Sequence, residues 1–171
     1  MLQTQDWLLN PSNCPGFETY EKGDHVQHGP QIHHTEYLVV KIPKRYALVN
    51  ITDRVNEVLH RSKVQDGFCY VGAMHITAGI YVNDAESGLL SDISKWIEKL
   101  APFGSAYEHH KTGEDNGDAH MKSYLTNHQI MVPITKGKLD FGPWQQIFYA
   151  EFDGLRHKRI LVKITGLAQH S

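Results

Sequence analysis

Cysteine and long apolar runs are scarce in this 171-residue sequence. Its two cysteines, Cys14 and Cys69, lie far apart and form no C-x-x-C pair, so the sequence indicates neither a disulfide framework nor a cysteine zinc knuckle. No apolar run approaches the ~20 residues that a helix needs to cross a bilayer. The first residues also lack the basic start and the apolar core of a signal peptide. We therefore expect a cytoplasmic protein that has no membrane partner.

An excess of positive charge is absent as well. Lysine and arginine number 17 against 19 acidic residues, and the formal net charge is −2. Without a positive field to hold a phosphate backbone, a nucleic-acid partner is disfavoured. The content of 40% hydrophobic and 21% charged residues is typical of a globular protein. The length fits a single domain.

The sequence divides into an irregular extension, residues 1–31, and one domain, residues 32–171. The extension shows no periodicity and contains many turn formers. In the domain, apolar spacing predicts two long helices, over residues 52–64 and 86–102, and a short helix near residues 118–125.

Strand-forming runs fill most of the remaining domain. Runs of β-branched and aromatic residues predict strands over residues 33–43, 68–83, 128–135, 139–142, 144–152 and 157–165. Tight turns between the later strands, including a predicted hairpin at Asp153-Gly154, imply antiparallel pairing. The expected fold is α+β: an antiparallel sheet or sandwich with two long helices and one short helix in a single domain.

Histidines are unusually concentrated in the segment YEHHKTGEDNGDAHMK, residues 107–122. Three neutral imidazoles with one open coordination position form a common type of metal site. The candidate ligands are His75 near a strand end, His109 or His110, and His120, because strand ends and helix starts gather at one edge of a sheet. An ordinary surface loop, rich in the residues that turns require, explains the same segment equally well.

Three acidic residues occupy positions that solvation alone does not explain. Asp92 flanks the apolar stripe of the second helix, Asp118 stands at a helix start, and Glu151 shares a strand face with apolar residues. A carboxylate beside an imidazole can orient the ring or act as a general base. The alternatives are a helix cap for Asp118 and an ion pair with Arg159 or Lys163 for Glu151.

The loop also has features of an anion-binding site. Lys111, Asn116 and the neighbouring glycines offer backbone N–H groups, and Lys122 follows one helical turn later. The sequence contains neither a P-loop nor a dinucleotide-binding glycine pattern. A turn-rich surface loop is the alternative explanation.

The sequence resembles the YjbQ-like family of secondary thiamine-phosphate synthase enzymes in the segments HITAGIYVND, YEHH, NGDAHMK, VPITKGKLDFGPWQQI and EFDGLRHKRILVKITG. The resemblance covers roughly residues 33–166. It implies an antiparallel α+β fold, a homotrimer and a histidine-rich pocket that holds a divalent metal ion. Position by position, it places the metal ligands at His75, His109 and His120.

The activity that this resemblance implies is the joining of a pyrimidine diphosphate to a thiazole phosphate. In this interpretation Glu151, Asp118 and Asp92 are catalytic. The residues expected to bind the phosphorylated substrate are Lys122, Lys111, Asn116, Gln145 and Trp144. The metal is zinc or another transition metal, and magnesium is compatible with a diphosphate substrate.

The sequence departs from the family pattern at two positions. Asp84 stands where the family commonly has glutamate, and Ile76 replaces a small hydroxyl residue beside His75. The alternative function is a non-catalytic trimer that binds a metal or another ligand in the histidine pocket. A purely structural domain would instead scatter its histidines over the surface.

Overall fold

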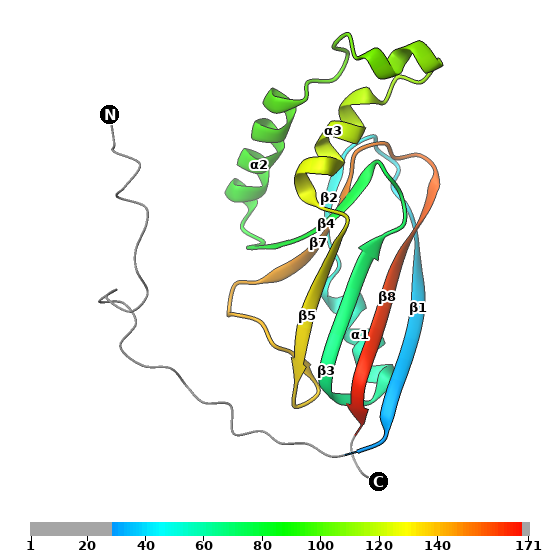
Figure 1. Cartoon of the computed structure of the whole chain (residues 1–171). Helices are drawn as coiled ribbons and strands as arrows, with labels where there is room; N and C mark the ends of the chain where they lie inside the picture. Colours follow the sequence, from blue (N-terminus) through cyan, green and yellow to red (C-terminus); the bar gives the residue numbers. More distant parts are fainter. Residues whose placement is uncertain (1–28, 169–171) are drawn as a thin grey trace, which may run out of the picture.

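The computed structural model describes residues 29–168, in which two antiparallel sheets form the framework (Figure 1). The larger sheet has the strand order β1-β8-β3-β5-β6, and the smaller sheet has the order β2-β7-β4. The strands are β1 (Gln31–Lys41), β2 (Ala47–Asn50), β3 (Val64–Ala73), β4 (Ala78–Asn83), β5 (Gln129–Thr135), β6 (Lys138–Leu139), β7 (Gln146–Glu151) and β8 (His157–Ala168). Of the extension predicted for residues 1–31, residues 1–28 lie outside the described residues.

Helices cover the sheets at two places. The helical elements are α1 (Thr52–Ser62), α2 (Ser87–Leu100), the 3-10 helix η3 (Glu108–Thr112) and α3 (Gly117–Thr126). The predicted α+β fold with its three helices is therefore confirmed. Within residues 29–168, no helix has the length and apolar content required to span a membrane.

The main core lies between the two sheets and α1. Alternate residues of β8, namely Ile160, Val162 and Ile164, are fully buried on its inner face, as the period of two in a strand requires. The opposite face of the larger sheet carries half-exposed apolar side chains such as Tyr37 and Phe68. No helix lies in front of this outer face (Figure 1).

The central strand of the smaller sheet, β7, is buried on both faces because it lies between layers. One face of β7 contributes Ile147 and Tyr149 to the main core. The other face contributes Ala150 to a second cluster, together with Phe152 directly after the strand and Ile97 of α2. Both faces of β7 are thus occupied, which explains why its sequence reads as a nearly continuous apolar run.

Few buried side chains attach α2 to this layer. In α2 Ile97 is buried, whereas Trp96 and Leu100 are 55% and 52% exposed. The prediction of the helix is confirmed, but most of its apolar stripe does not enter the core. Its N-terminus is fixed locally, because the carboxylate of Glu86 accepts hydrogen bonds from two N–H groups of the first turn at 2.6 and 2.7 Å.

The Asp153-Gly154 turn does not join a hairpin, in contrast to the prediction. β7 pairs with β2 and β4, whereas β8 pairs with β1 and β3, so this turn carries the chain from one sheet to the other. A Cβ atom at Gly154 would lie 1.9 Å from the carbonyl oxygen of Lys44. Glycine is required here for close backbone approach rather than for a hairpin turn.

Candidate functional site

Buried charges gather where the start of α3 meets the end of β7. Lys122 and Asp118 of α3, and Glu151 and Lys158 of the strands, are each 0–3% exposed. An unpaired charge in a protein interior costs several kcal/mol or more. The partners of these four side chains therefore determine how the region is built.

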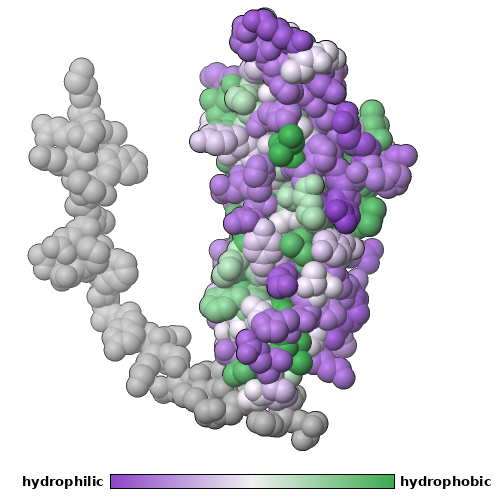
Figure 2. Space-filling view, turned by 45° about the vertical axis from the view of Figure 1, so that its right-hand side comes forward, coloured by the Kyte–Doolittle hydropathy of each residue, from purple (hydrophilic) through white to green (hydrophobic). Residues whose placement is uncertain are grey.

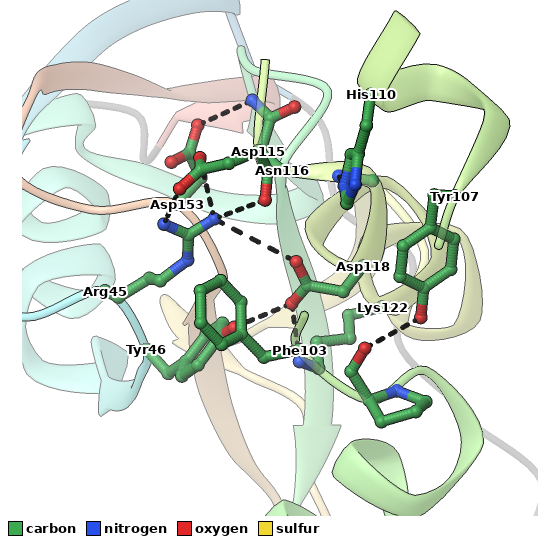
Figure 3. A network of polar contacts seen from close by, with 12 residues as sticks. Arg45, Tyr46, Phe103, Tyr107, His110, Asp115, Asn116, Asp118, Lys122 and Asp153 are labelled. Atoms are coloured by element: carbon green, nitrogen blue, oxygen red, sulfur yellow. Dashed lines mark hydrogen bonds and ion pairs between the residues drawn. The ribbon is translucent and has the colours of Figure 1, made fainter. Parts of the chain in front are cut away.

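The α3 side chains form the first charged group (Figure 3). Lys122 Nζ donates to Asp118 Oδ2 at 2.7 Å, one helical turn earlier, and lies 2.6 Å from Glu98 Oε2 at the end of α2. The hydroxyl of Tyr46 also donates to Asp118 Oδ2 at 2.7 Å, and the Tyr46 ring lies 4.2 Å from Lys122 Nζ. Burial alone would lower the pKa of Lys122, but its hydrogen bonds to Asp118 and Glu98 outweigh burial and raise it.

This geometry corrects the interpretation of Asp118 as a helix cap. The N-cap position belongs to Asn116, whose side chain makes no capping hydrogen bond. Asp118 lies inside the first turn and its carboxylate serves Lys122 and Tyr46. An acid near the start of α3 fits both a helix cap and a buried ion pair. The packing of Tyr46 against the helix is the contact that decides for the buried ion pair, and the sequence alone does not reveal it.

The second charged group lies between β7 and β8. Lys158 Nζ contacts Glu151 Oε1 at 2.5 Å and Thr77 Oγ1 at 2.8 Å. Glu151 also accepts hydrogen bonds from the Tyr149 hydroxyl at 2.7 Å and from the Asp153 N–H at 2.9 Å. Burial, followed by the hydrogen bond to Glu151, raises the pKa of Tyr149. The sequence offered Arg159 and Lys163 as alternative partners of Glu151. Both lie on the exposed face of β8.

The N-cap residue of α3, Asn116, is linked to the second charged group through Asp153, whose N–H donates to Glu151. Asn116 Nδ2 donates to Asp153 Oδ2 at 3.1 Å, and both side chains are buried. Two buried acceptor atoms of the described residues, Asn116 Oδ1 and Asp118 Oδ1, have no hydrogen-bond donor. Arg45 Nη2 lies 4.0 Å from the Asp118 oxygen, while its guanidinium forms a bidentate contact with Asp115 (Figure 3).

A cavity of about 430 Å³ opens beside the first charged group. Its walls combine apolar and aromatic side chains of β2, α2 and β7 with charged side chains: Tyr46, Ala47, Leu48, Ser94, Lys95, Ile97, Glu98, Lys122, Glu151 and Phe152. Lys122 and Glu151, one from each charged group, are its most deeply buried charged members. The cavity therefore has a mainly apolar lining that ends at fixed charges.

Of the three predicted metal ligands, the structure brings two into ring contact. His109 and His120 lie edge to face with ring centroids 4.6 Å apart, whereas His75 occupies the turn between β3 and β4 and contacts the Thr77 hydroxyl at 2.9 Å. Across residues 29–168, no group of three or more histidine, cysteine or acidic side chains could hold a metal ion. His110 instead packs against Tyr107, with ring centroids 5.4 Å apart.

Four other predicted site residues lie outside the buried charged groups and do not line the cavity. Asp92 is 78% exposed and pairs with a lysine one helical turn later at 3.7 Å. Lys111 is exposed and pairs with a glutamate of its own 3-10 helix. Trp144 is 73% exposed, and Gln145 accepts a hydrogen bond from a backbone N–H of its own loop. The proposed roles of these four residues remain predictions.

Glu98 and Lys158 were not predicted from the sequence. For Lys158 a signal exists, because it shares the buried face of β8 with Ile160, Val162 and Ile164. A lysine on an apolar strand face must find a buried partner. Glu98 carries no such signal, since its partner belongs to a helix more than twenty residues later.

The histidines of this region predict a loss of stability on acidification. Burial, followed by the charge of Lys158, lowers the pKa of His75, and burial, followed by His109, lowers that of His120. A histidine with a lowered folded pKa binds its proton more readily in the unfolded chain. Its stabilising contribution is complete above the ordinary value of 6.5 and decreases as the pH falls through that value.

We expect urea-unfolding midpoints to decrease between about pH 7.5 and about pH 5.5, and His75→Gln and His120→Gln each to reduce that decrease. The exposed His60 of α1 provides a matched control, and His60→Gln should leave the decrease unchanged. Glu36, with a pKa lowered to about 2 by Arg61, acts below this pH range. Equal wild-type midpoints at both pH values would contradict the prediction.

Comparisons with known proteins agree on one family. The family model described as "UPF0047 protein YjbQ-like" matches residues 36–167. A UPF0047 protein of Archaeoglobus fulgidus is 40% identical over 126 residues, covering 74% of this chain and 97% of the relative. A UPF0047 protein of Methanothermobacter thermautotrophicus is 37% identical over 133 residues, covering 78% and 92%.

Solved structures show the same fold. A protein of Sulfolobus solfataricus described as YbjQ-like and of unknown function has a TM-score of 0.76 at 31% identity, covering 80% of this chain and 99% of that one. A hypothetical protein of Aeropyrum pernix has a TM-score of 0.73 at 30% identity, covering 77% and 98%.

These findings correct the predicted function. The relatives are described only as UPF0047 proteins, and the solved structure as a protein of unknown function, so the metal-dependent thiamine-phosphate synthase activity and the transferase class have no support. Both the predicted enzyme and its non-catalytic alternative required a metal pocket built from histidines. The described residues contain no three-ligand group that could form such a pocket. A divalent cofactor elsewhere stays a prediction. The family itself is established by the sequence match and by the shared fold: the chain belongs to the UPF0047 family of YjbQ-like proteins.

Proposed function

We propose that this protein binds a small molecule in the cavity bounded by β2, α2 and β7. The observation that carries the proposal is the convergence of apolar cavity walls on buried charged side chains. Ligand sites typically combine a mainly apolar lining with a few fixed polar groups, and a volume of about 430 Å³ lies in their usual range. The ligand would place an apolar body against Leu48, Ile97 and Phe152 and a polar head toward Lys122.

The charges of the region support a small molecule rather than a macromolecule as the ligand. Lys122 lines the cavity but is only 2% exposed, so its ammonium group is not presented on the open surface where an extended polymer would bind. The net charge of −2 gives no general attraction for nucleic acid. A cytoplasmic location is part of the same proposal.

Obstructing the mouth of the cavity should weaken binding without unfolding the chain. Ser94 lines the cavity from the exposed side of α2, so Ser94→Trp places an indole ring at its mouth. Ser91 lies on the same helix, is exposed and does not line the cavity, which makes Ser91→Trp a matched control. Benzyl alcohol, a neutral aromatic probe with a polar head, can be titrated into ¹⁵N-labelled protein and followed by NMR.

We expect saturable shifts of the amide signals of Leu48, Ile97 and Phe152 in the wild type and in Ser91→Trp. Ser94→Trp should weaken binding at least ~10-fold, which corresponds to ~1.4 kcal/mol. Absence of saturable shifts at these residues in the wild type, or equal binding by Ser94→Trp, would contradict the proposal.

We also propose a homotrimer, with the outer face of the larger sheet as its contact surface. The family resemblance motivates the number of subunits. The half-exposed side chains of this face, Tyr37, Val39, Phe68 and Met131, support burial on assembly, because each is 51–66% exposed. From the side drawn in Figure 2, apolar side chains lie among hydrophilic ones at the protein surface.

Light scattering coupled to size-exclusion chromatography should give three times the chain mass of 19.5 kDa. Replacing Val39 by lysine would bury three like charges in the assembly and should shift the protein toward monomers. A wild-type mass of one chain would refute the trimer and leave the proposed cavity unaffected.

A further inference from the structure

Glu98 occupies the position that a bound anion would occupy beside Lys122. Its Oε2 atom lies 2.6 Å from Lys122 Nζ, and its Oε1 atom accepts a hydrogen bond from the Phe103 N–H at 2.8 Å. A buried ammonium and a backbone N–H thus converge on one carboxylate at the cavity wall. Charge-assisted contacts of this kind are the strong form of hydrogen bond.

The two carboxylates beside Lys122 differ in how firmly each is held next to the ammonium group. The Asp118 side chain is 1% exposed and also accepts the Tyr46 hydroxyl, so it is held on two sides. The Glu98 side chain is 46% exposed and stands in the last turn of α2, next to solvent. Glu98 can rotate outward while Asp118 remains in place.

We propose that the carboxylate of a ligand displaces Glu98 and takes over its contacts with Lys122 and the Phe103 N–H. This inference rests on the proposed cavity function and names the class of its ligand: a small monocarboxylate with an apolar body. A carboxylate supplies the same two oxygens and the same charge that Glu98 withdraws. Lys122 keeps its contact with Asp118 during the exchange, so the buried ammonium is not left without a carboxylate partner.

The local charge balance favours a monoanion over a dianion. Lys122 and Arg45 carry two positive charges, whereas Asp118, Asp115 and Glu98 carry three negative charges, so the group has a net charge of −1. Removing Glu98 makes it neutral, and a monocarboxylate restores the original value. A phosphate monoester would add a second negative charge beside the buried carboxylate of Asp118, and like charges at short distance repel.

Glu98 therefore competes with the ligand, and its removal should increase affinity for carboxylates specifically. The probes are benzoate and benzyl alcohol, which share an aromatic body and differ in charge, and phenyl phosphate as the dianionic arm. The variants of the full chain are Glu98→Ala and Glu98→Gln. Asp92→Ala is the matched control, because Asp92 is a carboxylate of the same helix that is 78% exposed and pairs with Lys95.

We expect the benzoate dissociation constant to decrease at least ~10-fold in Glu98→Ala relative to wild type and to Asp92→Ala. Glu98→Gln should show a smaller decrease, because the amide fills the space without the charge. The affinity for benzyl alcohol should increase by a clearly smaller factor than that for benzoate in Glu98→Ala, since the alcohol makes no charged contact with Lys122. Melting temperatures of the variants verify that each is folded, and Glu98→Gln carries the test if Glu98→Ala is unfolded.

The outcomes separate the two proposals. If benzyl alcohol binds the cavity but benzoate gains no affinity when Glu98 is changed, the displacement inference is wrong and the cavity function stands. An equal gain of benzoate affinity in Asp92→Ala would show that the loss of any negative charge on α2 has this effect, and would overturn the inference. A larger gain for phenyl phosphate than for benzoate would overturn the carboxylate assignment. If no probe binds at the cavity in any variant, both proposals fail.

Discussion

The burial of two lysine ammonium groups is the constraint on which the α3–β7 region depends. Lys122 and Lys158 are 2% and 3% exposed, so both ammonium groups are shielded from bulk solvent. Each is therefore paired with a buried carboxylate, Asp118 or Glu151. Removing one partner of such a pair leaves an uncompensated charge and typically costs about 3–5 kcal/mol. The Lys158–Glu151 pair joins β8 to β7 at the crossing between the sheets. The Lys122–Asp118 pair lies within α3 and attaches this helix through its contacts with Tyr46 and Glu98.

The same constraint explains how α2 is held in place. This helix buries little apolar surface, with Ile97 as its buried residue. Its C-terminal end is attached through Glu98, which contacts Lys122 and the backbone of Phe103. An ion pair at the end of a sparsely packed helix is easier to exchange than a core contact. Glu98 thus attaches the C-terminal end of α2 and, in the proposed exchange, also has to move before a ligand carboxylate can reach Lys122.

Local patterns predicted the elements of this fold better than their connections. The helices and most strands follow from apolar spacing, because burial of one face decides them. The connection at Asp153-Gly154 was misread, since a turn signal does not reveal that β7 and β8 belong to different sheets. The close approach of Gly154 to Lys44 is a long-range contact that no local pattern contains.

The candidate site was predictable only in part. Asp118, Lys122, Asn116 and Glu151 are buried as parts or neighbours of the charged groups. Strand periodicity indicated Glu151, whereas Asp118 was indicated by its place at a helix start, and Asn116 and Lys122 by the features of an anion-binding loop. The histidines form no three-ligand group among the described residues, since clustering in sequence does not fix the direction of an imidazole, and one ring nitrogen of His75 contacts Thr77. Glu98 could not be found, because its significance arises from a contact between two helices.

The titration of Lys122 tests the central claim, a charged lysine held between carboxylates at the cavity floor. Its side-chain signals can be assigned by NMR through comparison with Lys122→Met and followed with increasing pH. Because its contacts with Asp118 and Glu98 outweigh burial, the account predicts a pKa above the ordinary value of 10.5. A pKa below 10.5 would show a neutral amine favoured by its apolar surroundings and would contradict the account.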